Sequence, residues 1–190
     1  MPRLFTALEI PDEICSELYG LHQPLPGARW IEPSAYHLTL RFAGDIGNVL
    51  AREFIANLSE VNLDAFELTI SGLGAFGGRE PHSVWAGVQP CAALDALAKA
   101  HEKAARNAGL PPDKRSFTPH ITLARLKNSR PEDVAQYLTR YGGYRSEAFF
   151  VGQAVLMSSR PGVGGGPYAI EDRFPLRGGY TFSEDMDVNW

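Results

Sequence analysis

Apolar and polar positions follow two different periods along this chain, and each period predicts one type of secondary structure. Residues 37–40 and 120–123 place a leucine or isoleucine at every second position, as expected of strands with one buried face. Residues 91–108 instead repeat alanine and leucine at intervals of three and four, which is typical of an amphipathic helix. The full prediction comprises strands over 3–10, 28–31, 36–43, 66–73, 83–88, 117–126, 147–158 and 168–176, with helices just after Asp12 and over 48–58, 91–108 and 131–140.

The order of the predicted elements repeats once along the chain. One helix precedes and another follows each of the strands that contain 37–40 and 120–123. This repetition predicts an α+β fold of two lobes related by a pseudo-two-fold axis, in which two antiparallel sheets face a central groove and the helices lie outside. Because strands from both ends of the chain are expected to pair, residues 1–177 should form a single bilobal domain. Residues 178–190 form a weakly patterned, acidic C-terminal tail.

Composition and charge narrow the class of protein. The 190 residues include 18 Lys and Arg against 22 Asp and Glu, for a formal net charge of −4. This balance argues against a protein that coats nucleic acid through bulk positive charge. Two cysteines are too few for a disulfide framework or a cysteine-based zinc site. No stretch resembles a signal peptide or approaches the ~18 apolar residues of a membrane span, so we expect a cytoplasmic protein that works away from membranes.

The two short strands carry the most informative chemistry of the chain, because both have the form His-x-Thr-Leu. The first motif is His37-Leu38-Thr39-Leu40 and the second is His120-Ile121-Thr122-Leu123. In a strand, the histidine and the threonine of each motif point to one face and the apolar residues to the other. If the fold brings the motifs together, one cleft holds two imidazoles and two hydroxyls, a set that suits acid–base chemistry on a phosphate ester.

Each motif alone has a plainer explanation. A histidine and a threonine on one strand face are most often a half-buried hydrogen-bonding pair, and the second copy with the same apolar phasing favours a functional site. A zinc site at His37 and His120 would need a third protein ligand, which the sequence does not supply near either residue. We therefore expect neither a metal nor a cofactor. Of the other histidines, we expect His22 and His82 at the surface and His101 in the packing of the longest helix.

Two arginines flank the motifs. By simple alternation, Arg41 shares the strand face of His37 and Thr39. Arg125 follows His120 by five residues, so alternation places it on the opposite face. It reaches the groove only through a bulge or at the end of the strand. Spacing alone therefore favours Arg41 over Arg125 as a groove residue.

Aromatic residues and a glycine-rich run complete the candidates. Phe42 and Phe76 are candidates for a base-stacking surface at the groove, although most aromatic residues in strands belong to the core. The run 164–166 lacks the Gly-Lys-Ser/Thr ending of a phosphate loop and joins two predicted strands. We therefore interpret the run as part of a flexible hairpin.

Together, the motifs and their neighbours resemble the two-histidine (2H) phosphoesterase superfamily. Within it, the chain is similar to the RNA 2′,3′-cyclic phosphodiesterases, once called 2′-5′ RNA ligases. The resemblance spans roughly residues 3–177, and its most specific part is the second motif followed by Ala-Arg. It rests on the segments RLFTALEIP, RWIEPSAYHLTLRFAGDI, GLGAFGG, VWAGV, RSFTPHITLARL, VLMSS and RFPL.

The resemblance implies a metal-free hydrolase that opens the terminal 2′,3′-cyclic phosphate of RNA to a 2′-phosphate. His37 would act as the proton donor and His120 as the proton acceptor. Phosphate contacts would come from Thr39, Thr122 and Arg125, and the resemblance, not strand alternation, brings Arg125 into the site. The implied partner is an RNA with a cyclic phosphate end or a related nucleotide, and the protein is expected to act as a monomer.

Three alternatives remain open at this point. The same histidines could ligate or cleave 2′-5′ linkages, or hydrolyse cyclic phosphates on small nucleotides. The third alternative is a non-catalytic module that binds RNA ends. Two titrating histidines argue against such a module, because binding alone does not require them.

Overall fold

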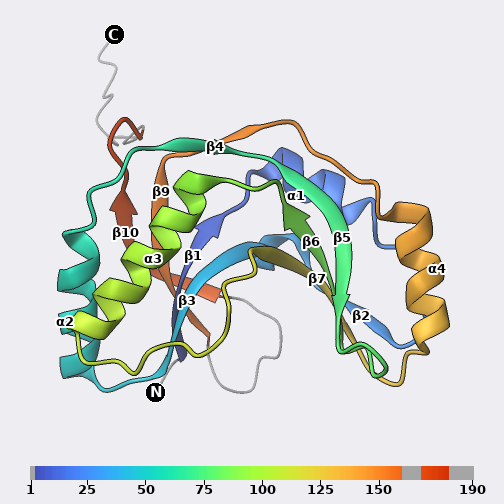
Figure 1. The fold of residues 1–190 in the computed structure, drawn as a ribbon, viewed down its shortest axis with the longest axis horizontal. Coiled ribbons are helices and arrows are strands. Elements are labelled where there is room, and N and C mark those ends of the chain that lie inside the picture. Colours follow the sequence, from blue (N-terminus) through green and yellow to red (C-terminus); the bar gives the residue numbers. More distant parts are fainter. Residues whose placement is uncertain (1–2, 160–167, 180–190) are drawn as a thin grey trace, which may run out of the picture.

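The computed structural model describes residues 3–159 and 168–179, which form the arched α+β fold of Figure 1. The glycine-rich run and residues 180–190 of the tail therefore lie outside the described residues. No helix in the described part of the chain is long and apolar enough to cross a membrane. The elements are β1 (Arg3–Glu9), α1 (Asp12–Tyr19), β2 (Ala28–Trp30), β3 (His37–Asp45), α2 (Asn48–Ser59), β4 (Phe66–Leu68), β5 (Ile70–Phe76), β6 (Ser83–Val88), α3 (Ala92–Asn107), β7 (His120–Leu126), α4 (Pro131–Tyr141), β8 (Phe149–Val151), β9 (Gln153–Ser159) and β10 (Tyr168–Pro175).

Eight strands form one antiparallel sheet whose two halves meet at the strands that carry the motifs. The strand order is β10-β9-β1-β3-β7-β6-β5, and β2 also pairs with β7. A single residue pair, Leu38 with Ile121, joins β3 to β7, so each half is a four-stranded antiparallel sheet of its own (Figure 1). The strands β4 and β8 form a separate two-stranded sheet. The predicted α+β class with two antiparallel sheets is confirmed, and the seam between them places the motifs side by side.

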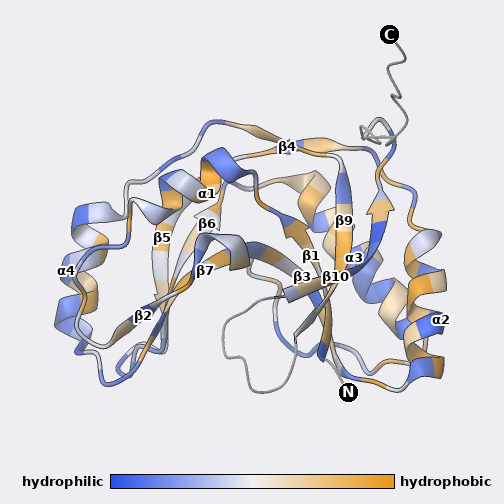
Figure 2. Ribbon diagram, turned by 180° about the vertical axis from the view of Figure 1, so that it is seen from behind, coloured by the Kyte–Doolittle hydropathy of each residue, from blue (hydrophilic) through white to orange (hydrophobic). Residues whose placement is uncertain are grey.

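Helices cover each half, and the apolar residues between helix and sheet form the cores. Leu4, Phe54 and Leu156 are buried where α2 and α3 pack on the half that contains β1, β3, β9 and β10. Val84 and Val134 are buried where α4 packs on the other half. Figure 2 shows hydrophilic and apolar residues alternating along α2 and α4, as expected of amphipathic helices. Strands from both ends of the chain pair in one half, where β9 lies beside β1, and α3 packs beside β3 although it precedes β7 in sequence (Figure 1). Each half therefore contains segments from separate parts of the chain.

Two predicted strands are each divided in the structure. The region predicted as one strand over 66–73 contains β4 and the start of β5, and 147–158 contains β8 and most of β9. In both regions the first strand pairs in the small sheet and the second in the large one, which explains the break. The strand predicted over 117–126 begins at His120.

A one-residue bulge interrupts the alternation of β3 directly after the threonine of the first motif. Ala7 of β1 faces Thr39, and Thr6 faces Arg41, so Leu40 is the extra residue. Leu40 and Arg41 are consequently both buried. A bulge of this kind reverses which face the following side chains occupy.

The second motif has the same bulge in β7. Trp85 of β6 faces Thr122, and Val84 faces Ala124, so Leu123 is the extra residue. Leu123 and Ala124 are both buried in turn. The two halves therefore repeat a backbone irregularity as well as a sequence motif.

Candidate active site

A cavity of about 1100 Å³ opens between the two motif strands. Thr39 of β3 lines it, as do His120, Thr122 and Arg125 of β7. The fold thus gathers three of the four polar motif side chains at one cavity, although the motifs lie in distant parts of the chain. The wall also includes Phe42, Phe76, His82, Asp113, Arg115 and Phe117.

His37 is not among the residues that line the cavity. Its ring packs against the ring of Phe5, with 5.0 Å between the centroids, and edge-on against Tyr168 at 4.9 Å. The ring of His120 has Phe76 edge-on at 5.0 Å. Aromatic rings from other strands of the same half therefore contact each motif histidine, but only His120 lines the cavity.

Both histidines make the same hydrogen bond. Nδ1 of His37 lies 2.8 Å from the carbonyl oxygen of Ala35, and Nδ1 of His120 lies 2.6 Å from that of Thr118. A carbonyl oxygen only accepts hydrogen bonds, so Nδ1 of each ring carries a proton and donates it. Each Nε2 is then left to give or take a proton, which is what general acid–base catalysis requires.

The surroundings of His37 favour its neutral form. Burial lowers the pKa of His37 below its ordinary value of 6.5, the hydrogen bond to Ala35 raises it, and the charge of His120 lowers it again. The last effect places the two imidazoles within electrostatic reach of each other across the seam of the sheet. A protonated His37 therefore needs a compensating negative charge beside it.

The bulge at Leu123 turns Arg125 onto the face of His120. Regular alternation predicts that Arg125 points to the opposite face. The pairing of β7 with β6 leaves Leu123 as an extra residue, and this extra residue reverses the face of Arg125. Arg125 is exposed and lines the cavity together with Thr122. Its guanidinium is thus available to an anion in the cavity.

The bulge at Leu40 has the reverse effect on Arg41. The prediction that Arg41 shares the strand face of His37 is wrong, because the extra residue turns its guanidinium towards α3, where it binds Glu102. Part of the Arg41 side chain still lines the cavity. Its charge, however, is paired with Glu102, which also lines the cavity.

The two aromatic candidates both lie at the cavity. Phe42 is 47% exposed and takes the groove face that alternation assigns to Arg41, with its ring 5.7 Å from that of Phe5. Phe76 lies in the other half, beside His120. The cavity therefore has an aromatic ring in each half of the sheet.

The remaining histidines divide between the cavity and the core. His82 is exposed, as expected, and it also lines the cavity, with its ring 6.3 Å from that of Phe76. No sequence signal marks it, because the β5–β6 hairpin alone brings it there. His22, also expected at the surface, is partly buried, with Nε2 2.5 Å from the hydroxyl of Tyr36. His101 has the packing role that its helix position predicts.

The donor set at the cavity suits an oxyanion. It offers imidazoles, threonine hydroxyls and a guanidinium, which are the groups that bind and stabilise phosphate oxygens. Within 3–159 and 168–179, no group of three or more His, Cys, Asp and Glu side chains is arranged to hold a metal ion. The cavity can therefore bind a phosphate ester and move protons around it.

Comparison with known proteins agrees with this chemistry. The family model of the 2′-5′ RNA ligase superfamily matches residues 10–161, which include both motifs and Arg125. This chain belongs to the 2′-5′ RNA ligase superfamily. The match runs from the residue after β1 through β9, and it includes both strands that meet at the seam.

Two curated proteins and one solved structure are similar to this superfamily member. The chain is 32% identical over 151 residues to a protein of Archaeoglobus fulgidus named RNA 2′,3′-cyclic phosphodiesterase, covering 77% of this chain and 83% of the relative. It is also 32% identical over 155 residues to a protein of the same name from Aquifex aeolicus, and the match covers 79% of this chain and 82% of that relative. The fold is similar to that of E. coli LigT complexed with 3′-AMP, with a TM-score of 0.75 and 26% sequence identity. The similarity covers 93% of this chain and 99% of the LigT chain.

Proposed function

We propose that this protein is an RNA 2′,3′-cyclic phosphodiesterase, which opens the terminal cyclic phosphate of an RNA to a 2′-phosphate. The observation that carries the proposal is the matched pair His37 and His120. Each binds a backbone carbonyl through Nδ1 and keeps Nε2 for proton transfer. The name of the relatives from Archaeoglobus fulgidus and Aquifex aeolicus supports the same reaction.

Hydrolysis of a cyclic phosphodiester needs a base and an acid. In the proposed reaction, His120 takes a proton from water as the water oxygen forms a bond to phosphorus. His37 gives a proton to O3′ of the ribose as the bond between phosphorus and O3′ breaks. The phosphate stays on O2′, and proton exchange with solvent returns both imidazoles to their starting forms.

The other polar side chains of the cavity support the charge of the phosphate. The hydroxyls of Thr39 and Thr122 and the guanidinium of Arg125 bind its non-bridging oxygens, where negative charge grows in the transition state. The same negative charge favours the protonated form of His37 and so offsets the effect of burial on its pKa. The proposed steps are complete with these side chains and need no metal ion.

A second candidate is the cleavage or ligation of a 2′-5′ phosphodiester, and one observation favours it. The cavity has an aromatic ring in each half, Phe42 from β3 and Phe76 from β5. A 2′-5′ linkage carries a nucleoside on each side of its phosphate, so both bases would have a ring on which to stack. In ligation the same histidines would act with a ribose 5′-hydroxyl in place of water, and cleavage would be the reverse of that step, with O5′ as the leaving group.

The deciding experiment uses a short synthetic RNA that ends in a 2′,3′-cyclic phosphate, incubated with the protein with and without EDTA. The position of the phosphate in the product is then mapped. We expect a 2′-phosphate, formed at the same rate in EDTA. A 3′-phosphate product, or an EDTA loss that zinc or manganese restores, would overturn the proposed mechanism.

Two further arms complete this experiment. The double variant His37→Ala/His120→Ala, prepared in parallel, controls for a contaminating nuclease and should be inactive. Tight binding of the RNA by the wild-type protein without turnover would indicate an RNA-end-binding module instead of an enzyme.

A further inference from the structure

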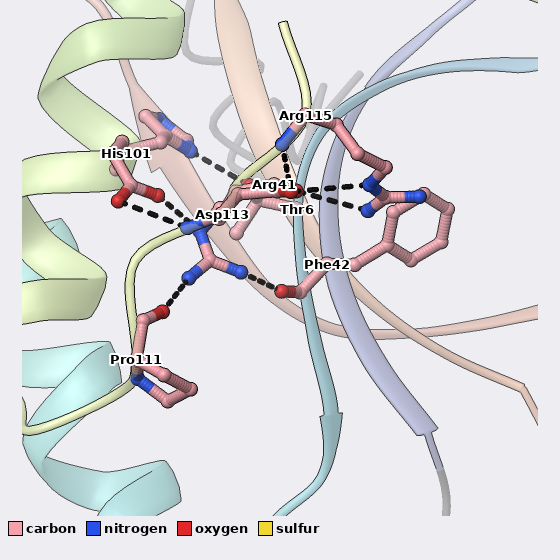
Figure 3. A network of polar contacts seen from close by, with 8 residues as sticks. Thr6, Arg41, Phe42, His101, Pro111, Asp113 and Arg115 are labelled. Atoms are coloured by element: carbon pink, nitrogen blue, oxygen red, sulfur yellow. Dashed lines mark hydrogen bonds and ion pairs between the residues drawn. The ribbon is translucent and has the colours of Figure 1, made fainter. Parts of the chain in front are cut away.

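A buried arginine, Arg41, ties three segments of the chain together beside the cavity (Figure 3). Its Nε donates to Glu102 of α3, its Nη1 to the carbonyl of Phe42, and its Nη2 to the carbonyl of Pro111, the last at 2.5 Å. Arg41 is only 7% exposed, whereas the side chain of Glu102 is 30% exposed at the cavity. The guanidinium itself is therefore largely shielded from water, and shielding strengthens the hydrogen bonds of a charged group.

The contacts continue from Glu102 into the loop that precedes β7. Oε1 of Glu102 accepts the backbone N–H of Asp113 at 3.3 Å. The Asp113 carboxylate accepts three N–H groups of Arg115 at 3.0, 3.1 and 2.9 Å, and these bonds lower the pKa of Asp113 to about 2. The Arg115 guanidinium lies over the ring of Phe42, 5.3 Å from its centre. The network therefore returns to the strand where it began (Figure 3).

The loop 111–118 contains no helix or strand that could hold it in place. Five of its residues, 113 and 115–118, nevertheless line the cavity. The side chain of Arg115 is 69% exposed and Phe117 is also exposed, so both are open to a ligand. The Arg41 network is what connects this part of the cavity wall to β3 and α3.

The bulge in β3 does not by itself require an arginine. In β7, Ala124 occupies the equivalent buried position, so a small apolar residue satisfies the same backbone. A buried ion pair also adds little stability over apolar packing, because the cost of desolvation offsets the attraction. The contribution specific to Arg41 is the placement of the loop.

We propose that the loop 111–118 is the nucleoside-binding wall of the active site, and that Arg41 and Glu102 are positioning residues that hold it there. This inference rests on the proposed function and adds to it the side of the cavity on which the nucleoside lies. Asp113 occupies the Nε and Nη2 groups of Arg115, so what Arg115 offers a ligand is mainly the flat face of its guanidinium. Such a face stacks on a nucleobase as it stacks on Phe42.

Binding measurements separate the nucleoside from the phosphate. Calorimetry with adenosine 2′-monophosphate and with inorganic phosphate gives two dissociation constants, whose ratio reports the contribution of the nucleoside. Arg115→Ala should weaken nucleotide binding by about 10-fold, the scale of one lost stacking contact, and leave phosphate binding unchanged. The matched control is Arg130→Ala, which breaks an exposed ion pair with Asp133 at α4 and should change neither constant.

The positioning role is tested by the double variant Arg41→Met/Glu102→Gln, which removes both charges and leaves no buried charge unpaired. It should weaken nucleotide binding by about 10-fold and raise KM for the cyclic-phosphate RNA, with little change in kcat. Arg41→Lys, which keeps the charge but not the fork, should restore part of the affinity. The triple variant that combines these two changes with Arg115→Ala should bind the nucleotide no more weakly than Arg115→Ala alone, because all three changes act through one loop.

Each result either supports or overturns the proposal. Additive effects of the double variant and Arg115→Ala, or equal losses of phosphate and nucleotide binding, would overturn the positioning role. Arg115 is exposed, so Arg115→Ala should fold and tests the nucleoside-binding role of the loop even if the double variant does not fold. Unchanged nucleotide affinity in Arg115→Ala would overturn that role. A wild-type protein that binds the nucleotide through Arg115 but leaves the cyclic phosphate intact would overturn the proposed function alone.

Discussion

Phe42 and Arg125 occupy equivalent positions in the two halves of the sheet. Each is the fifth residue after the histidine of its motif, and each follows a bulge, at Leu40 or Leu123, that turns it towards the cavity. The two halves thus share a backbone conformation but differ in side chain at this position, because one half supplies the ring of Phe42 and the other the guanidinium of Arg125. A substrate with a nucleobase on one side of its phosphate matches this asymmetry.

The cation is tested by substitution. Arg125→Ala should lower kcat/KM for the cyclic-phosphate RNA by about 10²-fold, the usual effect of losing one preorganised contact to transition-state charge. Arg125→Lys should recover only part of the rate, since lysine cannot bind two phosphate oxygens through a fork. Steady-state kinetics measures both variants. A wild-type rate for the alanine variant would mean that the bulge only brings Arg125 to the surface.

The sequence pattern predicts the α+β class and the four α-helices of the described residues, and it fails where the backbone departs from regular alternation. Neither bulge is visible in the pattern, because each depends on pairing with a strand from elsewhere in the chain, β1 or β6. Alternation therefore places Arg41 on the wrong face, and only family resemblance brings Arg125 into the site. The cavity position of His82 is hidden for a similar reason, since it depends on how the β5–β6 hairpin pairs with β7.

The shared orientation of the two motifs, by contrast, follows from their apolar pattern once the strands pair. Leu38 and Ile121 are the second residues of the two motifs, and they form the pair that joins the halves. Both are fully buried, so the apolar face of each motif strand contributes to a common core. With the apolar faces buried together, the polar faces necessarily share one side of the sheet.

The two histidines should each be needed for turnover. His37→Ala and His120→Ala are expected to lower kcat by ~10²–10⁴-fold, the range for a lost general acid or base. Removing both should cost little more than the worse single change, because the two imidazoles serve one reaction. Both side chains are only partly buried, so circular dichroism should show folded variants. A near-normal kcat in either single variant would make that histidine structural.

The pH dependence of the rate should be bell-shaped, because one imidazole has to be neutral while the other is protonated. Burial lowers the pKa of His37 below 6.5. In a bell-shaped profile, the lower of the two pKa values sets the acidic limb. The acidic limb of kcat/KM, which reports the free enzyme, should therefore lie below 6.5, although both limbs belong to the coupled pair. Measuring kcat/KM at low substrate concentration from about pH 5 to about pH 9 reports the free enzyme and avoids a limit set by product release. A flat profile would contradict catalysis by two imidazoles.

His101 should make the fold sensitive to acid. It is 1% exposed, its Nδ1 lies 2.9 Å from Oγ1 of Thr6, and burial lowers its pKa from 6.5 to about 4. The unfolded chain binds the proton more readily, so the stability from neutral His101 is present above pH 6.5 and is lost as the pH falls towards 4. From this residue alone, the free energy of unfolding in urea should be about 2 kcal/mol lower at pH 5 than at pH 7.

His101→Gln isolates this effect, because glutamine can still hydrogen-bond Thr6 but does not titrate. The variant should be less stable than the wild type at pH 7, since its side chain has a different shape in a packed core. Between pH 7 and pH 5, however, it should lose less stability, because the unfolded state no longer gains a proton at this position. Equal losses in both proteins would assign the acid sensitivity to another titrating group, such as the partly buried His37, whose pKa burial also lowers.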